Sequence, residues 1–242
     1  MLLRRVMEHV QTQNWTAVAL DFFIVVIGVF IGIQLGNWNE ARGDRSLEKY
    51  YIQRLSEDLQ SSMALNAYLD QVVDQRIEEA RIVRNALDDC SDVDAGLFGN
   101  TVLSIGKNAA PQLARGVYLE LLSTGNQELI RSRPLREALT DAYDYVELQE
   151  KLFDLISGDE RQARVVIASR VSLRIDAPFD YDARHPASAF RFDYDTLCRD
   201  DVFLNAVDQL MTSNFDTKGR YARVRERLEK LRASLAAYTE EI

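Results

Sequence analysis

The sequence contains little proline, histidine or cysteine. Its 242 residues include 4 prolines, 2 histidines, 2 cysteines and 11 glycines. Few helix breakers in a chain of this length favour long helices over a fold of short strands and turns. The histidines, His9 and His185, lie on opposite sides of a long apolar run, which argues against a histidine-based metal centre.

The common catalytic motifs are also missing. The sequence has no nucleophile elbow, P-loop, dinucleotide-binding glycine fingerprint, H-E-x-x-H or Cys-x-x-Cys. We therefore expect no cofactor and no metal, and a protein that is not an enzyme. An enzyme of an unrecognised type is the remaining alternative.

Positive charge is in deficit, since the formal net charge is −9. Within residues 1–36, Arg4 and Arg5 balance Glu8 and Asp21, so the excess of acid belongs to the rest of the chain. An acidic domain repels phosphate backbones, and nucleic acid is not an expected partner.

The two cysteines, Cys90 and Cys198, are too far apart in sequence for a zinc knuckle. They are either joined by a disulfide, which requires an oxidising compartment, or are two buried free thiols.

One segment is long and apolar enough to cross a membrane. Every residue from Phe22 to Ile33 is apolar, and the run extends from Ala17 to Gly36 with Asp21 and Gln34 as its interruptions. A helix of about 20 residues spans about 30 Å, the thickness of the hydrocarbon layer. Trp15 and Trp38 flank the run as interfacial anchors.

A buried core helix and a cleaved signal peptide are the alternatives. A core helix of this length rarely lacks a polar face, and no A-x-A-like cleavage site follows the run. The sequence therefore predicts an N-terminal tail at 1–14, a transmembrane helix at 15–38 and a soluble helical domain at 39–242. A single pass through the inner (plasma) membrane is the expected location.

The flanking charges leave the orientation open. Arg4 and Arg5 precede the run, whereas Arg42, Arg45, Lys49 and Arg54 follow it, which by count places the domain in the cytoplasm. These four alternate with acids, and large domains can cross regardless of such charges. We expect the domain outside the cytoplasm.

Small residues form a stripe on the predicted transmembrane helix. Gly28, Gly32 and Gly36 recur every four residues, and Asp21 falls on the same side two turns earlier. Such spacing lets a second helix approach closely, so we expect another membrane protein or a second copy as partner. Asp21 either faces that partner or is solvated at the interface.

Three blocks carry a resemblance to a known family. They are the apolar run from Asp21 to Gly43 with its Asn37-Trp38-Asn39-Glu40 exit, the block Tyr118–Arg131, and the block Phe192–Asn205. Together they resemble a family of uncharacterised bacterial single-pass membrane proteins. Gly36 stands where that family has asparagine, and Asp21 where it more often has glutamate. The resemblance implies the membrane topology and no activity.

Hydrophobic spacing predicts a mainly α, long-helix bundle after the membrane segment. We expect a helix through 39–87 whose apolar stripe is interrupted by Ser62, Asn66 and Arg76. We then expect a loop at 88–110 and helices at 111–123, 134–156 and 160–175. An irregular stretch at 176–198 follows them and has room for a small β-hairpin. Gly125 is expected to stop the helix at 111–123, and Gly158 to separate the helices at 134–156 and 160–175.

The C-terminal helix has the most regular spacing. Its apolar residues lie three and four apart: Tyr221, Val224, Leu228, Leu231, Leu235 and Tyr238. This pattern is typical of coiled-coil packing, either against the first long helix of the same chain or against a second copy.

Two kinds of function agree with these features. The first is a membrane-anchored scaffold or accessory subunit that acts through helix–helix and protein–protein contacts. The second is an extracytoplasmic helical bundle that senses a ligand and signals through a separate partner.

Overall fold

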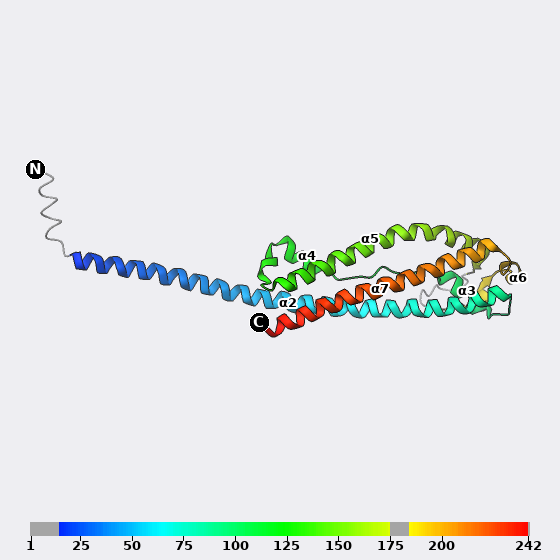
Figure 1. Ribbon diagram of the computed structural model, residues 1–242, viewed down its shortest axis with the longest axis horizontal. Coiled ribbons are helices and arrows are strands. Elements are labelled where there is room, and N and C mark those ends of the chain that lie inside the picture. Colours follow the sequence, from blue (N-terminus) through cyan, green and yellow to red (C-terminus); the bar gives the residue numbers. More distant parts are fainter. Residues whose placement is uncertain (1–14, 175–183, 242) are drawn as a thin grey trace, which may run out of the picture. The chain divides into compact units, whose positions relative to one another are not determined.

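The structure is a computed structural model that describes residues 15–174 and 184–241; the side chains of residues 15–18, Asp21 and Asp159 lie outside that description. The mainly α architecture predicted from the sequence is confirmed (Figure 1). The elements are α2 (Trp15–Asp89), α3 (Ala95–Ser104), α4 (Gly116–Ser123), η1 (Asn126–Leu129), α5 (Arg133–Arg170), β1 (Ser172–Leu173), η2 (Ala187–Ala189), β2 (Phe190–Arg191), α6 (Tyr194–Leu197) and α7 (Asp201–Glu241).

The chain divides into two compact units within α2, one ending at Tyr50 and the other beginning at Tyr51. The predicted soluble domain starts at residue 39. The core of the second unit begins at Tyr51 and Ile52, which are 4% and 2% exposed. The division into compact units therefore assigns residues 39–50 to the first unit.

The first unit contains the apolar run. Near its N-terminal end α2 is long and apolar enough to cross a membrane, with a mean hydropathy of 1.7 over a window of which 0% is buried. Large apolar side chains along 22–35 are exposed, from Phe22 at 66% to Leu35 at 59%. By length and composition, this is one candidate membrane-spanning helix.

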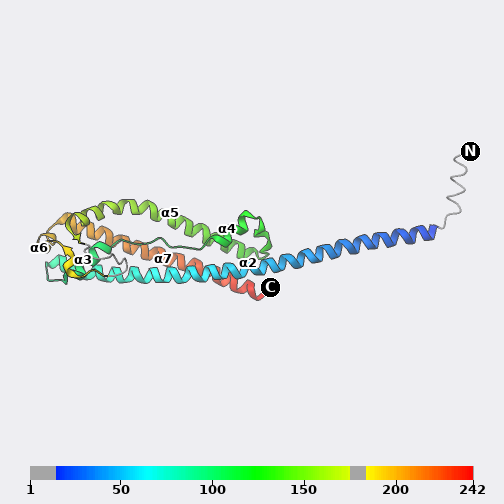
Figure 2. The same cartoon turned by 180° about the vertical axis from the view of Figure 1, so that it is seen from behind.

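The second unit is built on α2 from Tyr51, α5 and α7, which lie side by side in two opposite views (Figures 1 and 2). One hydrophobic cluster joins the start of this part of α2, α4, the start of α5 and the end of α7. Another joins the end of α2, α3, the end of α5 and the start of α7. The order of the clusters along each helix makes α2 and α5 run in one direction and α7 in the other.

Because α2 and α5 run in the same direction, the chain must travel back along the bundle between them. It does so through α3 and then through residues 105–115, which we call the return segment. This segment is not helical between Lys107 and Arg115, and it ends at α4; from Leu113 on it contributes to the first cluster.

Several expectations about local structure were wrong. The predicted loop at 88–110 contains α3, which is capped by Asp94 through a 2.7 Å bond from the Leu97 amide. The helix expected from Pro111 begins at Gly116, because the preceding backbone bonds to side chains of α2 instead.

Gly158 does not break α5, which runs from Arg133 to Arg170 and replaces the two helices expected at 134–156 and 160–175. A single glycine costs a helix only about 1 kcal/mol, and the residues on both sides bury apolar side chains. Gly125, in contrast, has a φ of +72° just beyond α4 and ends that helix as expected.

The small antiparallel sheet expected near 176–198 is present, with its second strand inside that range and its first strand just before it. Ser172 pairs with Arg191 and Leu173 with Phe190, so the first strand precedes residue 176. Val171, which follows α5 and precedes the first strand, is buried in the core at 1% exposed. Residues 175–183 lie outside the described part of the chain.

All six residues of the predicted C-terminal stripe are buried in α7, which begins 20 residues earlier than the stripe. Asp200 precedes the helix, and its Oδ1 accepts hydrogen bonds from the amides of Val202 (3.0 Å) and Phe203 (3.1 Å). From Val224 on, the stripe belongs to the first cluster with Ile52, Leu55 and Leu59 of the same chain, while Tyr221 packs in a small third cluster with Val73 and Ile77.

Candidate functional site

The residues predicted for helix association lie on the first unit. A Cβ added at Gly28, Gly32 or Gly36 would meet nothing within 4 Å, so the stripe is open within this chain. Trp38 is 64% exposed. The side chains of Trp15 and Asp21 lie outside the described residues, and the roles of anchor and partner contact stay predictions.

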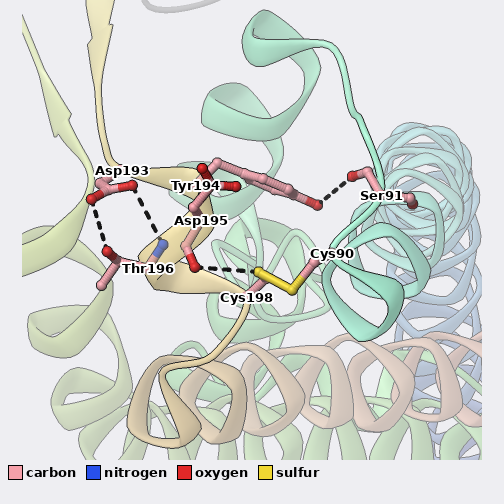
Figure 3. The surroundings of a disulfide bond; sticks show 7 residues. All are labelled: Cys90, Ser91, Asp193, Tyr194, Asp195, Thr196 and Cys198. Atoms are coloured by element: carbon pink, nitrogen blue, oxygen red, sulfur yellow. Dashed lines mark hydrogen bonds between the residues drawn. A yellow bond between two sulfur atoms is a disulfide. The ribbon is translucent and has the colours of Figure 1, made fainter.

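The two cysteines are joined by a disulfide (Figure 3). Cys90 follows α2 and Cys198 follows α6, and their Cα atoms are 5.4 Å apart, within the ordinary range for disulfides. Beside them the Tyr194 hydroxyl donates a 2.9 Å bond to the carbonyl of Ser91. The end of α2 is thereby fastened to the segment that leads into α7.

The most concentrated polar structure of the second unit surrounds the return segment. An extended backbone inside a helical bundle carries amides and carbonyls that need partners. Asn66 of α2 provides two: its amide nitrogen donates to the carbonyl of Gln112 (2.6 Å), and its oxygen accepts from the Gln112 amide (3.0 Å). Ser62, one turn earlier, accepts a 2.9 Å bond from the Ala114 amide.

The other two long helices bond the same segment. The Tyr143 hydroxyl of α5 donates to the carbonyl of Ala114, and the Tyr221 hydroxyl of α7 donates to that of Ala109, both at 3.0 Å. Asn214 of α7 accepts 3.0 Å and 2.9 Å bonds from the Gly106 amide and the Asn108 side chain. Burial raises the pKa of the Tyr221 hydroxyl to about 12, with the Asp70 carboxylate adding to the rise, so this donor stays protonated at neutral pH.

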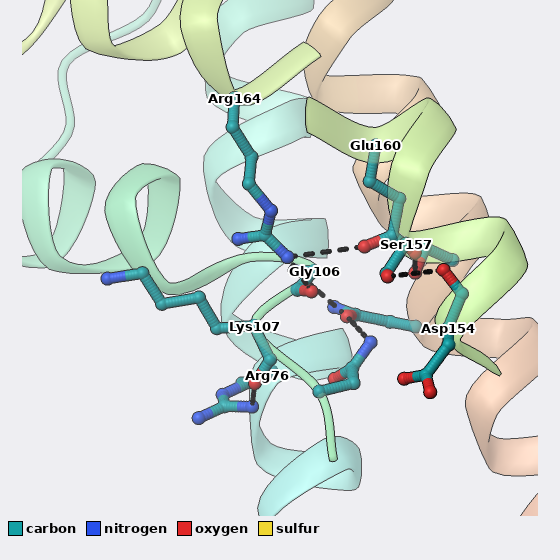
Figure 4. A network of polar contacts seen from close by, with 10 residues as sticks. Arg76, Gly106, Lys107, Asp154, Ser157, Glu160 and Arg164 are labelled. Carbon is teal, nitrogen blue, oxygen red and sulfur yellow. Dashed lines mark hydrogen bonds and ion pairs between the residues drawn. The ribbon is translucent and has the colours of Figure 1, made fainter. Parts of the chain in front are cut away.

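Two arginines complete the set at Gly106 and Lys107 (Figure 4). Arg164 of α5 donates to the carbonyl of Gly106, and Arg76 of α2 donates to that of Lys107. Glu160, whose side chain is 8% exposed, pairs with Arg164 at 3.2 Å and accepts a hydrogen bond from Ser213. We call these residues, from Ser62 to Tyr221, the polar layer; most of them lie between the two larger hydrophobic clusters along the helices, whereas Tyr143 belongs to the first cluster.

Positive charges crowd one part of the polar layer. Partial burial lowers the pKa of the Lys107 amine, and the charges of Arg164 and Arg76 lower it further. Burial likewise lowers the pKa of Arg76, while Tyr221 opposes and Arg164 adds to that effect.

An ion-paired groove lies beside the polar layer, between α2 and α7. Asp70, with a side chain that is 10% exposed, pairs with Lys218 at 2.8 Å and Arg225 at 3.1 Å. The groove has a volume of about 210 Å³ and its apolar walls include Met63, Ala67 and Leu228. Its carboxylate is already matched by two cations, so it offers no unpaired charge to a ligand.

The sequence indicates some residues of the polar layer but not their partners. Ser62, Asn66 and Arg76 were visible as polar interruptions of an apolar stripe, which is a signal for buried polar contacts. Their partners lie 31 to 52 residues away and include backbone groups, which no spacing rule identifies. Gly106, Glu160 and Asn214 had no signal at all.

Groups suited to metal binding do not gather in the part of the chain that the structure describes: no three of its histidine, cysteine, aspartate and glutamate residues lie close enough together. Comparison with known protein families, with curated proteins and with solved structures gave no match to this chain. Membership of the family suggested by the three sequence blocks stays a prediction.

Proposed function

We propose that this protein is a non-enzymatic scaffold or accessory subunit anchored in a membrane by a single helix. The observation that carries the proposal is the contrast between the two units. The second unit buries most of its apolar residues in its own clusters and leaves others exposed, such as Leu155, whereas the apolar run of the first unit is exposed along its whole length and bears an open glycine stripe. Lipid covers such a helix, and a second helix fits the stripe.

The soluble unit, in this proposal, lies outside the cytoplasm. The disulfide between Cys90 and Cys198 supports this side, because structural disulfides persist in oxidising compartments. The acidic character of the chain agrees with a role in protein contacts rather than in binding nucleic acid.

The test is gentle detergent extraction of the full-length protein followed by native mass measurement. Replacing Gly28 and Gly32 with leucine adds bulk to the stripe and should convert a complex or homo-oligomer to the free chain. The control is Val26→Leu with Phe30→Leu, on the opposite side of the same helix. An unchanged complex in the glycine variant would remove the helix-association part of the proposal.

Ligand sensing is the second candidate function, and the polar layer favours it. Buried polar groups that separate two apolar cores give a helical bundle a place where a small polar ligand can bias its packing. This function predicts that some small molecule raises the thermal midpoint of the soluble unit in the full-length protein. It also requires a separate signalling partner.

A further inference from the structure

The middle of α5 is attached to the bundle more weakly than its two ends. The first hydrophobic cluster includes α5 residues up to Val146, and the second includes them from Ala163 on. Between these two positions, the buried side chains among those described are Gln149 and Glu160. Both are polar, so apolar burial holds the ends of α5 and not its middle.

The hydrogen bonds to other elements lie at the edges of this stretch. At one edge Gln149 accepts a 3.2 Å bond from Arg220 of α7. Its neighbour Glu150 forms a 2.6 Å ion pair with the return segment. At the other edge Glu160 accepts a hydrogen bond from Ser213 of α7.

Residues 151–158, which we call the strap, lie between these attachments. Their side chains make no hydrogen bond, ion pair or ring contact to another element in the described part of the chain. The bonds that they do make stay within α5, as in the pair of Lys151 with Glu147. More than two helical turns therefore have neither a polar contact to the bundle nor a fully buried side chain.

Apolar side chains of the strap are left uncovered. Phe153 follows Val146 by seven residues and Ile156 precedes Ala163 by seven, so helical spacing places both on the inner side of α5. Ile156 is nevertheless 36% exposed, and Phe153 is only partly buried. Leu155 is 74% exposed. Figures 1 and 2 show α5 bowed away from α7 along this stretch, as an arch that is docked at its two ends.

Two neighbouring residues, Ser157 and Gly158, weaken the helix at the end of the strap. Pairs of serine and glycine are frequent sites of helix bending. The Ser157 hydroxyl donates a 2.9 Å bond to the Asp154 carbonyl, which in an α-helix also accepts from the Gly158 amide. A Cβ at Gly158 would meet nothing within 4 Å, so this glycine weakens the helix without allowing a closer approach of any neighbour.

We propose that the strap opens by unwinding at Ser157 and Gly158 while both ends of α5 stay docked. The bonds from Arg220 to Gln149 and from Ser213 to Glu160 bracket the stretch of α7 that the strap crosses. Ser213 is 8% exposed in the closed state. Opening gives water and small polar solutes a route to this side of the polar layer. The device goes beyond the proposed anchoring role and does not depend on it.

The experiment is hydrogen–deuterium exchange of the full-length protein in neutral detergent, resolved along α5 by mass spectrometry. Amides of residues 151–158 should exchange at least about tenfold faster than those of 138–146 and 163–169, because the docked ends stay folded when the strap opens. Gly158→Ala should slow exchange of the strap by about fivefold, since alanine is the better helix former.

The matched control is Gly219→Ala, at a glycine in the middle of α7 where an added Cβ has its nearest neighbour at 3.5 Å, an ordinary contact. It should leave exchange of the strap unchanged. Equal exchange rates along the whole of α5 would overturn the proposal. So would an effect of Gly158→Ala on residues 151–158 that is no larger than that of Gly219→Ala.

A chemical readout tests whether opening uncovers α7. Both native cysteines are in the disulfide, so the thiol introduced by Ser213→Cys is the reactive one. It should react with a small maleimide at least about tenfold faster than the thiol introduced by Ala142→Cys, at a position that is 1% exposed in the docked part of α5. Adding Gly158→Ala should slow the reaction at position 213 by about fivefold. Equal inertness of the two thiols would contradict an opening over α7.

Discussion

Single polar side chains in the bundle form hydrogen bonds with the backbone of the return segment, which in a helix or sheet would bond to other backbone groups. Ser62, Asn66 and Asn214 are at most 6% exposed, and each bonds the backbone or a side chain of the return segment. Tyr143 and Tyr221 add hydroxyl donors. Buried amides and hydroxyls are tolerated in an apolar stripe here because most of these bonds replace water at a backbone group, and Asn214 also bonds the Asn108 side chain.

Replacing Asn66 with alanine should lower the free energy of unfolding by about 1–2 kcal/mol, because Gln112 loses both of its hydrogen bonds to the side chain. Chemical denaturation followed by circular dichroism measures the change. Gln71→Ala, at an exposed position of the same helix, should stay within about 0.5 kcal/mol of the wild type. Equal effects of the two substitutions would show that Asn66 does not hold the return segment.

Gly99 and Gly116 form a second matched pair. A Cβ at Gly99 would lie 2.3 Å from the ring of Phe190, which is itself 7% exposed, whereas a Cβ at Gly116 meets nothing within 4 Å. Gly99→Ala should therefore destabilise the protein by about 2 kcal/mol through overpacking, and Gly116→Ala should be neutral or slightly stabilising. Thermal midpoints that fall equally in both variants would contradict the packing of α3 against β2.

At the scale of elements, caps and long-range bonds decide where helices begin. Pro111 suits the first turn of a helix, yet α4 starts at Gly116, because Leu113 is buried and its neighbours bond to α2. The start of α7 follows the local rule instead, with Asp200 capping it and pairing with Arg170 of α5. One carboxylate therefore serves both the helix start and the contact between two helices.

Asp200→Ala should lower the free energy of unfolding by about 1 kcal/mol at pH 7. The bond from Arg170 and the amides of Phe203 and Val202 hold the pKa of Asp200 below its usual range. A depressed pKa gives stability that is fully present above the unfolded-state value of about 4 and is lost as the pH falls through the folded-state value.

The difference between wild type and Asp200→Ala should accordingly shrink as the pH is lowered from 5 towards 2, in urea unfolding at each pH. Asp216→Ala, at an exposed position within α7, should show no such closing of the gap. A difference that is the same at pH 7 and pH 2 would mean that the ionised carboxylate contributes nothing.

At the scale of the whole molecule, the disulfide closes a long covalent loop in the described chain. Cys90 and Cys198 are 108 residues apart in sequence. A cross-link over such a loop restricts the unfolded chain, so replacing both cysteines with alanine should cost about 2–4 kcal/mol of stability. Reductant should lower the thermal midpoint of the wild type and leave that of the double variant unchanged; a wild type insensitive to reductant would contradict this.

The sequence predicted the features that depend on local periodicity. Residues only a few positions apart determine each of these features: the apolar run, the stripe of α7 and the stop at Gly125. The return segment, α3 and the unbroken α5 were missed, because they depend on contacts between residues far apart. Asn66 meets Gln112 across 46 residues and Asn214 meets Gly106 across 108, and nothing in the spacing of either residue indicates its partner.

Thiol labelling of carbonate-washed membranes tests whether a membrane anchor is joined to a soluble unit on the oxidising side. Cells that express the full-length protein are lysed in the presence of a thiol blocker, and the washed membranes are treated with polyethylene-glycol maleimide before and after reduction. We expect the protein to stay in the membrane pellet, to take up no label at first and to gain two labels after reduction. Release into the carbonate supernatant would contradict the anchor, and cysteines already blocked before reduction, which leave no later labelling, would contradict the disulfide and the side assigned to the domain.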